Sequence, residues 1–138
     1  MFDHCLYFNT TALARQLEKE WAQAFVPFGL TAPQAFLLRA ILDQPGLLQR
    51  EYAEAMAISR PTATRALDGL MEKALIERRS SAQDGREQTV FPTANAQSIH
   101  AELNAASVQV GKRLKKELGA DVFADAVDKI RGVRSALK

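Results

Sequence analysis

The chain has 138 residues, of which 47% are apolar and 25% are charged, and its formal net charge is +2. This composition is typical of a folded globular domain and excludes an intrinsically disordered chain. No apolar run approaches the roughly 18 residues of a membrane-spanning helix, and no secretory signal is evident, so we expect a soluble cytoplasmic protein without membrane contact. A single cysteine excludes an intramolecular disulfide and an all-cysteine metal site.

The first third of the chain shows the apolar spacing of two helices. Apolar side chains recur mostly every three or four positions from residue 6 to residue 28, where Pro27 and Gly29 end the pattern. Residues 31–34, Thr-Ala-Pro-Gln, match the capping box, in which the threonine and glutamine side chains bond the first N–H groups of a helix. A second helix is therefore predicted to begin there and to end at residues 44–46, Gln-Pro-Gly.

Two shorter helices are predicted next. Residues 49–57 form the first, although Leu48 lacks the side-chain oxygen of a good N-cap. The second begins after Ser59, a favourable N-cap residue that is followed by a proline in the first turn. Its apolar positions step by four, three and four residues and predict one buried stripe made of Ala63, Leu67, Leu70 and Ala74. The opposite face carries Arg60, Thr62, Thr64, Arg65, Asp68 and Gly69.

Beyond this helix the period of the apolar pattern changes to two, which is typical of β-strands. Residues 76–79 and 88–91 flank a polar segment that contains residues 84–85, Asp-Gly, which favour a turn, so a β-hairpin is predicted. Thr93 then caps a long helix that ends at Gly119. A last helix is predicted to bury Phe123, Ala126, Val127, Ile130, Val133 and Leu137.

Two short helices joined by a tight turn and followed directly by a β-hairpin are typical of a winged helix-turn-helix. The major groove of DNA, about 12 Å wide, admits one α-helix, which needs polar side chains at its N-terminal end to reach base edges. Arg60, Thr62, Thr64 and Arg65 offer such side chains. The hairpin would bring Arg86 to the minor groove, where the negative potential favours arginine.

Five segments, in this order and at these spacings, carry a resemblance to a known family. They are residues 30–34, 44–46, 58–65, 70–79 and 84–86, the last of which reads Asp-Gly-Arg. The set resembles the MarR family of bacterial transcriptional regulators. The chain departs from the family pattern at Ala74, where glycine is usual, at Tyr52, where leucine is usual, and at Pro92 and Ala96, which replace leucine and glycine. These positions concern helix ends and packing.

The resemblance implies a fold and an assembly. The fold is mainly α with a small β-hairpin wing: a winged helix-turn-helix over residues 30–95, flanked by N- and C-terminal dimerisation helices in residues 1–29 and 96–138. The assembly is a homodimer that binds double-stranded DNA at a pseudo-palindromic operator.

The resemblance also implies roles for individual residues. The helix of residues 59–75 reads DNA, Arg86 enters the minor groove, and Asp84 braces the wing. The predicted DNA-binding residues are Ser59, Arg60, Pro61, Thr62, Thr64, Arg65, Arg78, Arg79, Asp84 and Arg86.

Four charged side chains near this surface need a separate interpretation. Arg78 and Arg79 either contact a phosphate or simply flank the strand, and the sequence leaves both possibilities open. Asp68 and Glu72 would repel phosphate, so we interpret them as orienting arginines that lie one helical turn away.

Members of the family often bind small aromatic acids between the dimerisation region and the DNA-binding domain. The aromatic side chains available to line such a cavity are Tyr7, Phe8, Trp21 and Phe36, for each of which plain core packing is the alternative. The resemblance therefore favours a repressor that an aromatic or phenolic effector releases from DNA.

Cys5 suggests a different kind of regulation. It follows His4 near the start of the first helix, where it resembles the peroxide-sensing cysteine of the organic-hydroperoxide branch of the family, and a helix N-terminus favours a thiolate. However, Ala32 and Ala35 stand where that branch has tyrosines. A thiol-based, peroxide-responsive regulator is thus an alternative to the effector-released repressor.

A protein of another class is the remaining alternative. Residues 45–93 carry seven basic and seven acidic side chains, and the basic excess lies in residues 111–138, with eight against four. This balance is compatible with a winged-helix protein-interaction module that does not bind DNA. No nucleophile, base or metal-ligand arrangement indicates an enzyme, and no cofactor or metal is expected.

Overall fold

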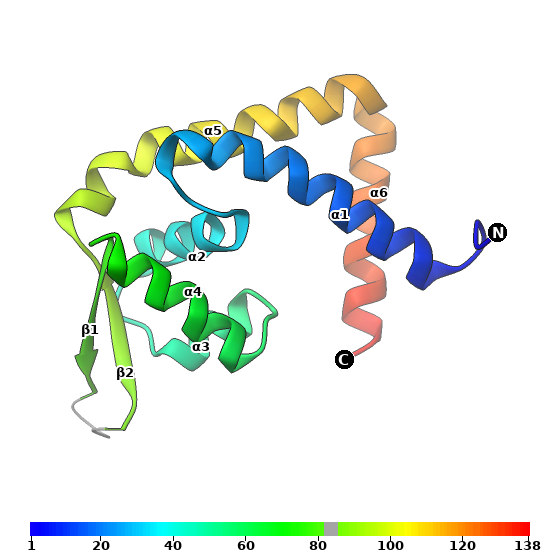
Figure 1. Cartoon of the computed structure of the whole chain (residues 1–138). Helices are drawn as coiled ribbons and strands as arrows, with labels where there is room; N and C mark the ends of the chain where they lie inside the picture. The colour runs from blue at the N-terminus through cyan, green and yellow to red at the C-terminus, as the bar shows by residue number, and fades with distance from the viewer. Residues whose placement is uncertain (82–85) are drawn as a thin grey trace.

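The computed structural model describes residues 1–81 and 86–138. Within them the chain forms six α-helices, one 3₁₀ helix and a two-stranded antiparallel sheet, which confirms the predicted mainly helical fold with a hairpin wing. In chain order the elements are α1 (Leu6–Phe25), η1 (Val26–Phe28), α2 (Ala32–Asp43), α3 (Gln49–Ala55), α4 (Arg60–Glu72), β1 (Ile76–Ser80), β2 (Gln88–Pro92), α5 (Ala94–Leu118) and α6 (Ala120–Ala136). Figure 1 shows the hairpin projecting from one end of the molecule and α6 standing at the other end, with α5 running between them.

Side-chain caps begin the helices where the sequence predicted them. In the capping box of α2, the Gln34 N–H donates to the Thr31 hydroxyl at 3.2 Å and the Thr31 N–H donates to Gln34 Oε1 at 3.1 Å. Ser59 and Thr93 cap α4 and α5, each accepting from a backbone N–H at 3.3 Å. Leu48 offers α3 no side-chain cap, as expected. Each polar cap contributes about 1 kcal/mol and fixes where its helix begins.

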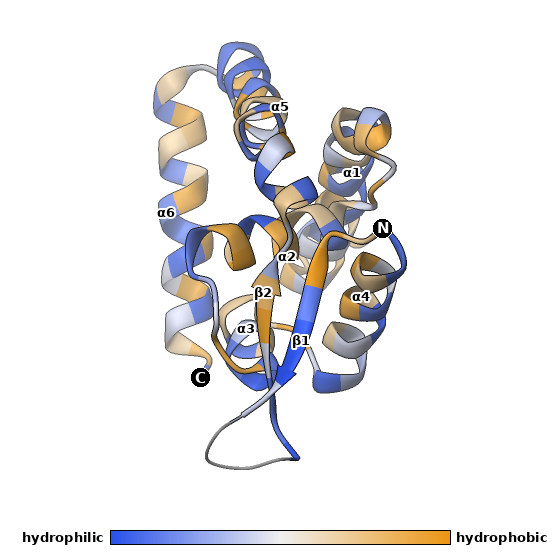
Figure 2. Ribbon diagram, turned by 90° about the vertical axis from the view of Figure 1, so that its left-hand side faces the viewer, coloured by the Kyte–Doolittle hydropathy of each residue, from blue (hydrophilic) through white to orange (hydrophobic). Residues whose placement is uncertain are grey.

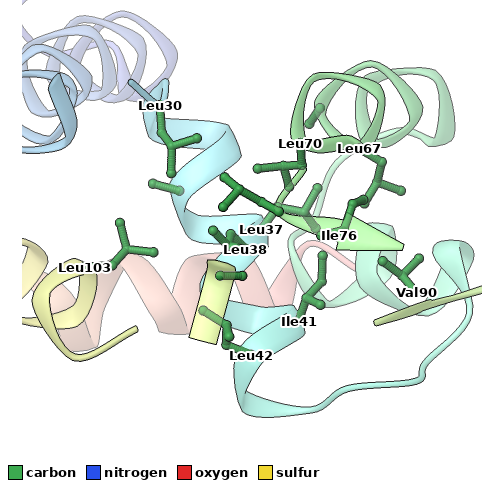
Figure 3. Packing of buried hydrophobic residues seen from close by; sticks show 14 of the residues in the cluster. Leu30, Leu37, Leu38, Ile41, Leu42, Leu67, Leu70, Ile76, Val90 and Leu103 are labelled. Carbon is green, nitrogen blue, oxygen red and sulfur yellow. The ribbon is translucent and has the colours of Figure 1, made fainter. Parts of the chain in front are cut away.

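A hydrophobic core joins α2, α4, the hairpin and α5 (Figure 3). Helix α2 lies at its centre and contacts α1, α3, α4, α5 and β2. Burying each large aliphatic side chain stabilises the fold by about 1.5–3 kcal/mol. This core therefore fixes the positions of α4 and the hairpin relative to α2. The fully or almost fully buried side chains include Leu37, Leu38, Ile41, Leu67, Leu70, Ile76, Val90 and Leu103.

The helix predicted to extend to residue 75 ends earlier, at Glu72. Ala74 has a φ of +57°, in the left-handed region. The Leu75 N–H donates to the Leu70 carbonyl and the Ala74 N–H to the Met71 carbonyl, both at 3.0 Å. These two bonds form a Schellman motif, whose left-handed position usually holds glycine. The prediction that Ala74 continues the buried stripe was wrong, because the chain has already left the helix there and Ala74 is exposed.

Gly69 does not lie on the open face of α4, where the sequence pattern put it, but against α2. A Cβ at this position would clash with the side-chain amide of Gln34, which would have to move. Nearby, the Lys73 ammonium donates to Gln34 Oε1 at 3.3 Å and also to the Gly29 carbonyl. The missing side chain of Gly69 therefore leaves room for the Gln34 amide where it caps α2 and meets Lys73.

The apolar face of α6 is uncovered within the chain. Ala126 is exposed and Phe123 is half-buried. The larger exposed side chains are Val127 (43% exposed), Ile130 (44%), Val133 (40%) and Leu137 (76%). The predicted burial of this face was wrong for a single chain, because α6 turns away from α5 at its start and descends beside the rest of the molecule (Figure 1). Figure 2 shows apolar positions recurring along α6 among polar ones.

None of the helices in residues 1–81 and 86–138 is, on its own, long and apolar enough to cross a bilayer. One pair of segments bent by 68°, Leu6–Phe28 with Ala32–Asp43, reaches the required length and composition when taken together.

Candidate nucleic-acid interface

The N-terminal half of α4 presents hydroxyl and basic side chains to solvent. The exposed residues are Ser59, Arg60, Pro61, Thr64 and Arg65, whereas Thr62 is half-buried. The Thr62 hydroxyl accepts from Ser59 Oγ at 2.9 Å and from Arg65 at 3.5 Å, which orders the first turn. The Thr64 hydroxyl donates to the Arg60 carbonyl at 3.0 Å. Exposed guanidinium groups thus lie at the positive end of a helix, an arrangement that attracts phosphates and base-edge acceptors.

The hairpin is held beside the helix-turn-helix by contacts along its second strand. The Gly46 N–H donates to the Val90 carbonyl at 2.8 Å, and the Val90 N–H donates to the Leu47 carbonyl at 3.0 Å. Arg50 of α3 pairs with Glu87, just before β2, with an Nε–Oε1 distance of 2.9 Å. These contacts limit how far the hairpin can swing relative to α3 and α4.

Tyr52, a departure from the family pattern, strengthens the same anchor. Its side chain is buried, and its hydroxyl donates to the Gln44 carbonyl while accepting from the Leu47 N–H at 3.2 Å. Burial raises the pKa of the Tyr52 hydroxyl, so the proton needed for this bond is retained. Tyrosine here therefore adds a polar tie between α3 and the segment of residues 44–47, whose backbone bonds to β2.

Arg86 is exposed on the C-terminal side of the loop between β1 and β2. The next residue, Glu87, is the one tied to Arg50. Arg86 is thus adjacent to a residue that is held against α3. Asp84, predicted to brace the wing, lies outside the described residues.

Arg78 and Arg79 are consecutive on β1, and their surroundings differ. The Arg79 side chain is 58% exposed, its guanidinium lies 3.9 Å from the centre of the Phe91 ring, and it pairs with Glu77 at 3.1 Å. The Arg78 side chain is only 14% exposed and pairs with Asp68 at 2.7 Å. Arg79 therefore faces solvent and Arg78 faces α4. The partner of Asp68 lies ten residues along the chain, not one helical turn away as the sequence suggested.

The four aromatic residues considered for an effector cavity lie in two separate places. Tyr7 and Phe8 are exposed at the start of α1, and Phe8 lies against Phe2. Trp21 is about 20 Å further along the same helix, at 1.5 Å per residue. Its ring centre lies 6.4 Å from that of Phe36, and both side chains line a groove between α1, α2 and the turn that connects α3 to α4. The structure brings Trp21 and Phe36 together, without Tyr7 and Phe8.

A partly buried polar cluster lies behind Phe36, and sequence analysis missed it. Arg39 donates from Nε to Asn104 Oδ1 at 2.7 Å and from a terminal nitrogen to Ser107 Oγ at 2.9 Å, while Trp21 donates to the same oxygen at 3.0 Å. The Arg39 guanidinium lies 5.1 Å from the Phe36 ring centre, and burial lowers the pKa of Arg39. The sequence feature that could have indicated this cluster is Ser107, a polar residue on the buried stripe of α5.

Cys5 is exposed and occupies the N-cap position of α1. Its carbonyl accepts from the Asn9 N–H at 3.1 Å and from the Asn9 side-chain amide at 2.9 Å. Ala32 and Ala35 are both buried. Over the described ranges, no group of three His, Cys, Asp or Glu side chains is placed to hold a metal ion.

Known proteins share both the sequence pattern and the fold. Residues 28–87 match the sequence profile of the MarR family. The transcriptional regulator HosA of Escherichia coli O157:H7 is 32% identical over 88 residues, which cover 64% of this chain. The same match covers 62% of HosA, so the chain spans less than two thirds of that relative.

Solved structures extend the similarity over almost the whole chain. The PcaV transcriptional regulator from Streptomyces coelicolor, solved in complex with its natural ligand, is 27% identical with a TM-score of 0.78 and covers 91% of this chain and 92% of its own. The transcriptional repressor CouR, solved bound to a 23-mer DNA duplex, is 22% identical with a TM-score of 0.86 and covers 96% and 94%. Residues 28–87 of this chain therefore match the MarR family of winged helix-turn-helix transcriptional regulators, and the chain as a whole shares the fold of these solved regulators.

Proposed function

We propose that this protein is a homodimeric transcriptional regulator that binds a specific DNA operator. Helix α4, the reader helix, enters the major groove, and the hairpin β1–β2, the wing, reaches the adjacent minor groove. The observation that carries this proposal is the exposed hydroxyl and basic face at the N-terminal end of α4, beside a hairpin that is tied to α3 through Arg50 and Glu87. The DNA duplex in the CouR structure supports it, because the two chains share one fold.

The exposed side chains have different roles in the proposed DNA binding. Arg60, Thr64 and Arg65 contact base edges and nearby phosphates, with Ser59 and Pro61 at the helix start approaching the backbone. Thr62 orders the first turn through its hydroxyl. On the wing, Arg86 enters the minor groove, Arg79 contacts phosphate, and Asp84 keeps its proposed bracing role.

A second copy of the chain completes the proposed regulator. Leu6 and Tyr7 of α1 line a groove of about 460 Å³ together with Ile130, Val133 and Leu137 of α6, and all five side chains are at least 40% exposed. A soluble monomer seldom leaves so continuous an apolar face uncovered. A partner covering it would set two reader helices about 34 Å apart, one turn of DNA, which favours a pseudo-palindromic operator.

Selection of DNA by the intact protein tests this function. The full chain is incubated with a duplex library carrying a random central segment, bound DNA is recovered over several rounds, and a variant with Arg60→Ala and Arg65→Ala is run in parallel. We expect wild type to enrich a pseudo-palindromic sequence that the variant does not enrich. Enrichment by neither protein would contradict DNA reading by α4 and favour the protein-interaction module.

We further propose that an aromatic or phenolic carboxylate releases this repressor from DNA. Arg39 lines a groove with Phe36, Met56 and His100, and Phe36 and Met56 also line the neighbouring groove that contains Trp21. A guanidinium held against a ring suits a planar acid. Met56 is the C-cap residue of α3 and stands directly before the turn into α4. An occupant would therefore press on the turn that sets the direction of the reader helix. The natural ligand in the PcaV structure supports a small-molecule effector.

Effector binding is measured with a panel of hydroxybenzoates and matched uncharged benzamides. We expect a carboxylate to raise the unfolding temperature and to weaken operator binding, and Arg39→Gln to lose both effects while still binding the operator. Equal responses to acids and amides, or an undiminished response of Arg39→Gln, would contradict the assignment of Arg39.

A further inference from the structure

We propose that Arg78 is a positioning residue for DNA recognition: it ties the reader helix to the first strand of the wing and fixes their spacing without touching DNA itself. This inference rests on the proposed DNA-binding function. It separates Arg78 from Arg79, which the sequence leaves equivalent as a phosphate contact.

The strand register places Arg78 on the inner face of the wing. Arg78 pairs with Val90 across the hairpin, and Ile76 lies two residues before it on the same face. Val90 is fully buried and Ile76 is 3% exposed. Side chains two residues apart in a strand lie on the same face of the sheet. The Arg78 side chain therefore points toward the core and α4, whereas the Arg79 side chain points toward solvent.

The guanidinium of Arg78 bridges two positions one turn apart on α4. One terminal nitrogen donates to Asp68 Oδ1 at 2.7 Å, and the other donates to the Thr64 carbonyl at 3.5 Å. Thr64 and Asp68 are four residues apart and therefore lie on one face of the helix. Contacts at two points resist rotation of α4 about its own axis as well as movement away from the strand, and α4 carries the side chains that read DNA.

Exposure at this pair argues against a direct phosphate contact by Arg78. The Asp68 side chain is 56% exposed and that of Arg78 is 14% exposed. A phosphate approaching from solvent would therefore meet the carboxylate before the guanidinium. In addition, Arg78 Nε is buried, with no hydrogen-bond partner in the described part of the chain, so this nitrogen is not presented to the surface.

The tie matters because reader helix and wing engage two grooves of the same DNA. Once α4 is bound, the effective concentration of the wing at the minor groove depends on how narrowly their separation is held. Loosening the tie lowers affinity without removing any charge that neutralises phosphate. The affinity should therefore fall while its dependence on salt stays the same.

The test measures operator affinity of the full-length protein across a salt series for wild type, Asp68→Asn, Arg78→Gln, Arg78→Lys and the Asp68→Asn/Arg78→Gln double variant. Arg79→Gln, on the neighbouring outward-facing position, is the matched control. Circular dichroism and thermal unfolding of each variant verify that the protein compared is folded; Asp68, as an exposed residue, tolerates substitution even where Arg78 does not.

We expect Asp68→Asn to weaken binding about tenfold although it removes a negative charge near DNA, with the salt slope of wild type retained. Arg78→Gln should weaken binding to the same extent. Arg78→Lys should bind no better than Arg78→Gln, because a lysine ammonium lacks the two terminal nitrogens with which the guanidinium contacts α4 at two points. The double variant should bind no more weakly than either single variant. Arg79→Gln should give a shallower slope.

Different results would refute the positioning role of Arg78 and the proposed DNA-binding function. Unchanged or tighter binding by Asp68→Asn, or a shallower slope for Arg78→Gln by about one phosphate contact per half-site, would overturn the positioning role and make Arg78 a DNA contact. If wild type itself shows no salt-dependent preference for the operator, the proposed function fails and the inference fails with it.

Discussion

The face on which a side chain lies decides its role at this interface. Arg78 and Arg79 differ by one position in a strand, and that difference alone turns one toward α4 and the other toward solvent. The alternation was available in the sequence, because Ile76 marks the inner face two residues earlier. The pairing of Arg78 with Asp68 was not available, since it depends on how closely the strand and α4 approach.

At Arg86 the expected contact is with the minor groove, and we predict that Arg86→Ala weakens operator binding by about 1–3 kcal/mol per half-site with a shallower salt slope. The side chain is exposed, so the circular dichroism spectrum and the dimer should be unaffected. Mobility-shift titration at several salt concentrations makes the measurement, with Arg15→Ala, an exposed arginine of α1, as control. Operator affinity equal to that of wild type would remove Arg86 from the interface.

At Cys5 we predict a negative result: Cys5→Ser binds the operator normally, and hydroperoxide releases wild type no better than the variant. The thiol is exposed, but a switch also needs polar partners that turn oxidation into movement of the reader helix. The alanines at 32 and 35 offer only buried methyl groups, and the sequence contains no second cysteine for an intramolecular disulfide. Fluorescence anisotropy over a peroxide titration compares the two proteins. Selective release of wild type at low micromolar peroxide would restore the redox alternative.

Helix boundaries show which elements the sequence determines locally. The capping box at Thr31 and the caps at Ser59 and Thr93 were predicted, because a cap depends on residues three positions apart. The end of α4 was misplaced, since Ala74 looks like another apolar residue of the stripe but adopts a left-handed conformation. Gly69 was likewise assigned to the wrong face, because only the packing of α2 reveals that its Cβ would meet Gln34.

The left-handed residue at the end of α4 leads to a stability prediction. Ala74→Gly should raise the free energy of unfolding by about 1 kcal/mol, because glycine relieves the cost of a Cβ at positive φ. Ala101→Gly, at an exposed position inside α5, should lower it by a similar amount and serves as the matched control. Urea denaturation at equilibrium measures both. A loss of stability in Ala74→Gly would contradict the role of this residue as the helix cap.

At the scale of the whole molecule, the sequence predicted the order of the elements but not which faces meet. The apolar stripe of α6 was recognised, yet it lies uncovered in a single chain, because periodicity identifies an apolar face and not its partner. The cluster of Arg39, Asn104 and Ser107 was missed for a related reason: its members come from helices far apart in sequence.

A dimer should cover the groove between α1 and α6. We predict that sedimentation of wild type at micromolar concentration gives a dimer and that Ile130→Glu gives a monomer with weakened operator binding, because a buried unpaired carboxylate is costly. Val26→Glu places the same charge on an exposed valine of η1, at the far end of α1 from α6, and should remain dimeric. A monomeric wild type that binds the operator fully would refute this assembly.

Sequence-specific DNA binding by the reader helix is the central claim, and one measurement tests it most directly. The affinity of the full-length protein is determined for its selected operator and for a scrambled duplex of equal length, at salt concentrations from low to physiological. We predict that the operator is bound at least about a thousandfold more tightly, that affinity for both duplexes falls steeply with salt, and that Arg60→Ala with Arg65→Ala abolishes the preference. Equal affinity for the two duplexes, or binding that is insensitive to salt, would contradict the assignment.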